Sequence, residues 1–114
     1  MIPGKYNMVC PQGSTFSKQL TYSINTVLVD LNGYTARMQV REKYTSTNTA
    51  VSLTTENGGI TLGGALGTID ILIGAATTTL LIPKEYVYDL ELISGTNVHR
   101  IIEGKFIVTP EVTK

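Results

Sequence analysis

The sequence has no tryptophan, one cysteine, one histidine and few charged residues, and each shortage excludes a class of protein. The single thiol, Cys10, cannot form an internal disulfide, so the chain is not a small disulfide-stapled scaffold. One histidine and one cysteine are too few for structural zinc, which takes about four ligands. Nine basic residues balance nine acidic ones among 114 residues, so we expect no nucleic-acid partner, which requires clustered positive charge.

Long apolar runs are also missing. The most apolar stretches, residues 69–76 and 79–82, are far shorter than the roughly 20 residues that span a bilayer. The first residues, MIPGKYNMVCPQG, lack the apolar segment of a signal peptide. We therefore expect no membrane partner and synthesis in a reducing cytoplasm.

What the sequence does contain favours strands. Hydrophobic residues make up 42% of the chain and charged residues 16%, so it is too apolar for a disordered segment. Seventeen threonines accompany many valines, isoleucines and tyrosines, all typical of β-strands. No stretch of twelve residues shows helical spacing, and the length fits one domain.

Several runs alternate with a period of two. The clearest are residues 34–42 and 86–92, and a third, 67–74, is expected to pair with 60–62 through Gly63 and Gly64. Further turns are predicted at residues 30–33, at residues 57–59 and at Gly95, and residues 75–81 fit either one helical turn or a crossover. The sequence predicts an all-β protein, a single antiparallel immunoglobulin-like β-sandwich of about seven to eight strands. The inward-facing side chains would be Ala36, Met38, Val40, Ile69, Ile71, Ile73, Tyr86, Tyr88, Leu90 and Leu92.

The leader differs from the rest of the chain. Residues 1–12 are expected to form an extended N-terminal arm ahead of a sandwich domain at 13–114, because Pro3, Gly4 and Pro11 disfavour a regular ladder. The arm is too apolar for a solvated tail, so we expect it to lie across a neighbouring subunit; the alternative is a frayed terminus. Its candidate interface residues are Ile2, Tyr6, Met8 and Val9.

No catalytic set emerges from the sequence. The glycine pairs at 58–59 and 63–64 fit hairpin turns, since no phosphate-loop lysine or helix follows them. Nothing in the pattern brings two carboxylates together for acid–base work, and their places on alternating strands fit a solvated face. His99 is expected at the surface and Cys10 as a small buried hydrophobe. We expect no enzyme activity, cofactor, metal or small-molecule substrate. The carboxylates in question are Asp30, Asp70, Asp89, Glu91 and Glu103.

The tyrosines divide into two groups. Tyr86 and Tyr88 share a face with leucines and are expected in the core. Tyr6 in the leader and Tyr44 in a polar loop have no place in the core, and exposed tyrosine is enriched at interfaces. Exposed aromatics would also serve a sugar-binding surface, but an aromatic content of 7% without tryptophan argues against it.

Taken in order, five segments resemble a family of small tailed-bacteriophage and prophage virion proteins. They are QGSTFS, VDLNGYTARMQVRE, LTTENGGITLGGALGTIDILI, YVYDLELISG and RIIEGKFIVTPEVT, and the resemblance covers residues 12–113. It implies a virion structural module related to the N-terminal β-sandwich of phage upper-baseplate proteins, a tail adaptor that docks other parts to the particle.

Expectations for partners follow from this resemblance. The chain would reside in the virion and bind other phage virion proteins and copies of itself. Two alternatives remain, a capsid decoration or head-associated protein and a host-glycan-binding module.

Overall fold

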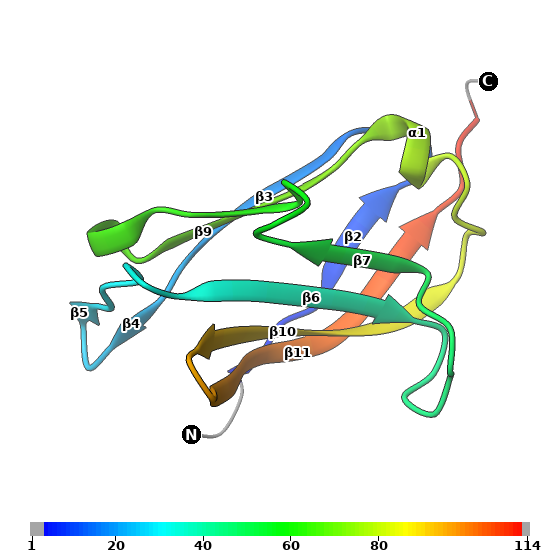
Figure 1. The fold of residues 1–114 in the computed structure, drawn as a ribbon. Coiled ribbons are helices and arrows are strands. Elements are labelled where there is room, and N and C mark those ends of the chain that lie inside the picture. The colour runs from blue at the N-terminus through cyan, green and yellow to red at the C-terminus, as the bar shows by residue number, and fades with distance from the viewer. Residues whose placement is uncertain (1–3, 113–114) are drawn as a thin grey trace.

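The computed structural model describes residues 4–112, in which two β-sheets face each other across a shared core (Figure 1). The larger sheet has the order β1–β11–β10–β6–β7, and β2 also pairs with β11. The smaller sheet has the order β3–β9–β8, and β4 pairs with β5 in a separate hairpin.

The strands of the larger sheet are β1 (Gly4–Lys5), β2 (Met8–Pro11), β6 (Thr35–Arg41), β7 (Val51–Thr54), β10 (Glu85–Ser94) and β11 (Asn97–Thr109). The smaller sheet holds β3 (Phe16–Thr21), β8 (Ile60–Leu62) and β9 (Thr68–Ile73), and the hairpin holds β4 (Ser23–Ile24) and β5 (Val27–Leu28). A 3₁₀ turn, η1 (Gly64–Leu66), and one short helix, α1 (Ala75–Thr78), complete the described elements.

This strand order is that of an immunoglobulin-like sandwich. In the letters used for that fold, the smaller sheet carries strands B, E and D as β3, β9 and β8. The larger sheet carries C, C′, F and G as β6, β7, β10 and β11. The all-β sandwich predicted from the sequence is confirmed. The strand number exceeds the expected one because β1, β4 and β5 are two-residue pieces.

The core follows the predicted alternation. Ala36, Met38 and Val40 of β6 are buried, and so are the alternate residues of β9 and β10 that the sequence singles out. Phe16 of β3 meets Phe106 of β11 edge to face, with ring centroids 5.4 Å apart. Strands with one buried face bring the two sheets together, so side chains from both fill the space between them.

The connection between β9 and β10 contains α1 and also crosses from the smaller sheet to the larger one, so both predicted alternatives, a helical turn and a crossover, are observed (Figure 1). Thr78 is fully buried there, and its hydroxyl donates to the Ser14 carbonyl at 2.8 Å. The hydroxyl of Tyr86 donates to the carbonyl of Ile82 at 2.9 Å. This is the tyrosine corner of immunoglobulin-like folds, which fixes the entry into strand F.

Of the two hairpin turns predicted at glycine pairs, one is confirmed and the other is not. Gly63 and Gly64 join β8 to β9 as a hairpin, as predicted. The hairpin prediction for residues 57–59 is wrong, because this turn carries the chain from β7 in the larger sheet to β8 in the smaller one. A Cβ at Gly59 would lie 2.7 Å from Leu53 Cδ2, so the crossing passes too close to β7 for a larger residue.

The leader also corrects an expectation. Residues 4–5 and 8–11 form parallel strands on β11 of the same chain, so Gly4 and Pro11 do not keep the leader out of a ladder. The amides of Tyr6 and Gln12 donate to β11 carbonyls, which places the even-numbered amides toward β11. Pro11 is odd-numbered and stands on an edge strand, where its missing N–H removes no ladder bond.

Candidate interaction surface

The β4–β5 hairpin projects from the connection between the two sheets. Ile24 pairs with Val27 across a two-residue turn, and both turn residues have positive φ, 51° at Asn25 and 66° at Thr26. That combination is typical of a type I′ turn, which favours Asn-Gly. A β-branched residue rarely adopts positive φ, so Thr26 stores backbone strain at the tip.

Backbone hydrogen bonds hold this hairpin against η1. The Tyr22 amide donates to the Gly67 carbonyl at 2.8 Å, and the Leu31 amide donates to the Gly64 carbonyl at 2.9 Å. Gly67 has φ 68°, and a Cβ there would lie 2.8 Å from the Tyr22 carbonyl oxygen. The close approach of these two connections therefore depends on glycine at position 67.

Exposed apolar residues lie on β4, β5 and η1, and backbone hydrogen bonds hold these elements side by side at this end of the sandwich (Figure 1). The exposed fraction is 67% for Val27 and 66% for Leu66, with the others near half. Solvent-exposed apolar groups on a strained, anchored hairpin are typical of an interaction site. We name this set the hairpin patch: Ile24, Val27, Leu28 and Leu66.

The hairpin patch was not predicted from the sequence. The turn between β4 and β5 lacks the glycine that usually signals a hairpin. The only local signal was Asn25, which tolerates positive φ better than most residues.

The outer face of the larger sheet carries a network of ion pairs. Arg37 pairs with Glu91 at 2.7 Å, and Arg100 bridges Asp89 at 3.7 Å and Glu103 at 3.6 Å. Lys5 donates a hydrogen bond to Glu103, which lowers the pKa of that carboxyl. Charges of both signs thus alternate over the sheet.

One expectation about carboxylates is wrong in part. Asp89 and Glu103 are direct partners in the β10–β11 register, although no pattern in the sequence indicated that two carboxylates would meet. Burial raises the pKa of Asp89, with a smaller contribution from the negative charge of Glu91. The expected solvated face is observed, since these groups are ion-paired on an open sheet surface.

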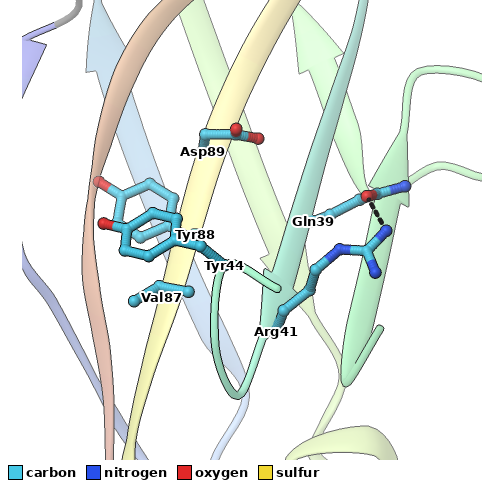
Figure 2. Close-up of a pocket in the computed structure, with 6 residues that line it drawn as sticks. All are labelled: Gln39, Arg41, Tyr44, Val87, Tyr88 and Asp89. Atoms are coloured by element: carbon cyan, nitrogen blue, oxygen red, sulfur yellow. Dashed lines mark hydrogen bonds between the residues drawn. The ribbon is translucent and has the colours of Figure 1, made fainter. Parts of the chain in front are cut away.

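A small hollow lies beside this network, on the outer face of β6 and β10 (Figure 2). Its volume is about 110 Å³, well below the range of about 300–1,000 Å³ that small-molecule sites occupy. The guanidinium of Arg41 donates to the carbonyl of Ser46 and to the side-chain oxygen of Gln39, at 2.7 and 2.9 Å. These bonds tie down the loop that carries Tyr44. The lining residues are Gln39, Arg41, Tyr44, Val87, Tyr88 and Asp89.

The candidate interface residues do not form one surface. Tyr44 is exposed at the hollow, and Val9 is exposed on β2. Tyr6 is partly exposed, with the Lys18 ammonium 5.1 Å from its ring centroid. Met8 is only 3% exposed and packs in the core. Ile2 lies outside the described residues.

The remaining candidates lie where the sequence places them. Cys10 is fully buried, and burial raises the pKa of its thiol. His99 is exposed on β11. Tyr86 and Tyr88 are both in the core, as expected.

Comparison with known proteins gives no match, either to a family model or to a curated protein. Over residues 4–112, no three or more His, Cys, Asp or Glu side chains are grouped to hold a metal ion. No helix in that described part is long and apolar enough to cross a membrane.

Proposed function

We propose that this chain is a non-enzymatic structural protein of a tailed-phage virion, docking to other virion proteins as a tail or baseplate adaptor. The virion assignment rests on the resemblance over residues 12–113 and on the sandwich fold that it implies. The docking mechanism rests on one structural observation, the hairpin patch.

The hairpin patch supports docking because its four apolar side chains are exposed to solvent and not buried in the core. Backbone bonds from Tyr22 and Leu31 fix the hairpin against η1, so little conformational freedom is lost when a partner covers it. The partner would be another structural protein of the same particle, with an apolar depression that covers the hairpin patch. Burying exposed apolar area contributes about 25 cal/mol per Å².

The balanced outer face of the larger sheet fits the same role. Its acidic and basic groups pair with each other, so the face carries no large field of one sign. Subunits with such faces pack closely without strong repulsion, as a dense particle requires.

The location test is labelling of intact virions. Antibodies raised against the purified chain are applied to virions from the strain that encodes it, and the bound antibodies are located by electron microscopy. Label at the tail or baseplate supports the proposal. Label over the head instead favours capsid decoration, and virions free of label overturn a virion role.

The docking test uses a patch variant. Val27→Thr keeps a β-branched residue but removes apolar surface from the hairpin patch, and we expect its incorporation into virions to fall several-fold. Leu72→Thr is the matched control, since Leu72 is an exposed apolar residue on the smaller sheet. Equal incorporation of the Val27→Thr protein and the wild type would exclude the hairpin patch as the docking surface.

A further inference from the structure

The N-terminal segment, residues 4–12, is attached to the body through a single short link. It pairs with β11 alone, along the edge of the larger sheet. Gln12 is the last residue of this segment, and its amide donates to the Thr109 carbonyl while its side chain donates to the Leu81 carbonyl, both at 2.9 Å. Only residues 13–15 then separate Gln12 from the start of β3 in the opposite sheet.

The body presents a shaped site for this segment. Met8 and Cys10 are buried against Phe106 and Val108, their direct partners in the parallel register. Gly104 leaves room for the Tyr6 carbonyl, because a Cβ there would lie 2.3 Å from that oxygen. Because of this apolar burial and close fit, the segment covers this edge of the core.

Polar contacts fix the register. The Tyr88 hydroxyl donates to the Tyr6 carbonyl, and the Lys105 amide donates to the Asn7 side-chain oxygen at 3.0 Å. The Tyr6 amide donates to the Glu103 carbonyl at 2.9 Å. All these partners belong to the body, so the body of a second copy offers the same set.

We propose that residues 4–12 exchange between copies of this chain, pairing with β11 of a second copy in the same register. Exchange keeps every contact of the segment, so the closed and exchanged forms differ mainly in the link and in the entropy of association. High local concentration favours the exchanged form by mass action. The proposed function includes contacts between copies of this chain, and this inference rests on it only because exchange would form one such contact.

Residues 13–15, which link the segment to β3, influence the balance between the closed and the exchanged form. Gly13 has φ 84°, and the Ser14 amide donates to the Pro11 carbonyl at 3.2 Å, closing a tight turn. A Cβ at Gly13 would lie 1.7 Å from a carboxylate oxygen of Glu111. The Glu111 carboxylate is the end of a flexible side chain and can move, so Gly13→Ala disfavours the closed turn through the positive φ at this position, and strained short links promote exchange.

A covalent trap distinguishes the two forms. In Val108→Cys the new thiol faces Cys10, its direct register partner and the only native cysteine. Neighbouring strands place Cα atoms about 4.8 Å apart, within the range that disulfides span. Joining the thiols requires a mild oxidant, such as oxidised glutathione, which accepts two electrons and two protons as the S–S bond forms.

The trap is applied to full-length protein refolded at low and at high concentration, then oxidised and run on a non-reducing gel. We expect covalent dimers and larger species whose ratio to monomer rises with protein concentration, and rises further in the Gly13→Ala background. The control combines Val108→Cys with Cys10→Ser, and covalent dimer there measures random oxidation. Intramolecular disulfide alone at every concentration and in both backgrounds overturns the exchange.

A second measurement covers the case in which Val108→Cys fails to fold. Light scattering on the wild type and on Gly13→Ala reports the mass at several concentrations, and strictly monomeric protein in both overturns the proposal. The outcome is independent of the virion test. If the protein is monomeric and antibodies against it label virions, the exchange is excluded and the adaptor role stands. If the protein forms exchanged oligomers and virions carry no label, the exchange stands and the virion role is excluded.

Discussion

The hydroxyl of Tyr88 donates a hydrogen bond to the backbone carbonyl of Tyr6, joining residues 82 positions apart. In a regular parallel ladder this carbonyl would accept the Lys105 amide. That amide is taken instead by the side-chain oxygen of Asn7, at 3.0 Å. A side chain on β10 and a side chain in the leader thus replace one ladder bond, and they fix the leader to the body.

Tyr88→Phe should loosen the leader. The substitution keeps the buried ring but leaves the Tyr6 carbonyl without its donor, which costs about 1 kcal/mol of unfolding free energy. Cys10 lies farther along the same segment and is fully buried, so its alkylation rate reports detachment. We expect a lower melting temperature and several-fold faster reaction of Cys10 with iodoacetamide in the folded protein.

The control for this prediction is Tyr86→Phe. It also removes a tyrosine-to-carbonyl bond, but the carbonyl belongs to Ile82 and not to the leader. The two variants should lose similar stability, while only Tyr88→Phe accelerates Cys10. Equal acceleration in both would mean that the thiol reports general instability and not the Tyr6 contact.

Gly104→Ala should displace the leader by steric contact. The new Cβ would lie 2.3 Å from the Tyr6 carbonyl oxygen, so the backbone of one strand must move. Overpacking of this kind costs about 1–3 kcal/mol. Hydrogen exchange should accelerate at the β2 amides and much less at those of β6, in the centre of the sheet.

Gly74→Ala is the matched control for position 104. Gly74 has φ −67°, and a Cβ there meets no atom within 4 Å. We expect β2 exchange at the wild-type rate in this variant. Unchanged β2 exchange in Gly104→Ala as well would show that the leader does not depend on the close approach.

The parts of the fold that the sequence predicts are those set by local pattern. The alternation of Ala36, Met38 and Val40 specifies which face of β6 is buried, and Gly95 specifies the hairpin between β10 and β11. Period and turn chemistry act over a few residues, so both can be recognised without knowing the partner strand.

The leader and the hairpin patch could not be predicted in the same way. β2 pairs with β11 across nearly the whole chain, and a parallel partner so distant leaves no local signature. Pro11 indicated that the leader would not join a ladder. Whether its missing N–H faces β11 or solvent depends on the register of the strand pairing, which no local pattern reveals. The turn at Asn25 and Thr26 contradicts local preference, so the strain itself is invisible until the structure is known.

Asp89→Asn should stabilise the protein at neutral pH and lose that advantage in acid. Burial raises the pKa of Asp89 above its ordinary value of 3.8, so the folded state binds the proton more tightly than the unfolded state. The carboxylate therefore opposes folding above the raised pKa, and this penalty is gone below pH 3.8. We expect a gain below about 1 kcal/mol, because the group is partly exposed.

Unfolding in urea at pH 7 and at pH 3 measures this difference. Glu85→Gln serves as the control, since it removes a carboxylate of an exposed ion pair with Lys105 on the same face. A gain for Asp89→Asn that is the same at both pH values would contradict burial as its cause.

Thr26→Gly should stabilise the protein without weakening docking. Thr26 has φ 66°, a conformation that costs a residue with a Cβ about 1–2 kcal/mol and costs glycine almost nothing. Glycine loses more entropy on folding, which offsets about 0.5–1 kcal/mol of that gain. We expect a net increase of about 0.5–1 kcal/mol by urea unfolding, and a smaller one for Asn25→Gly, since asparagine tolerates positive φ. Incorporation of the Thr26→Gly protein into virions should equal that of the wild type, because the apolar side chains of the hairpin patch remain. A stability unchanged by Thr26→Gly would show that the turn stores no strain, and lost incorporation would place Thr26 itself in the docking contact.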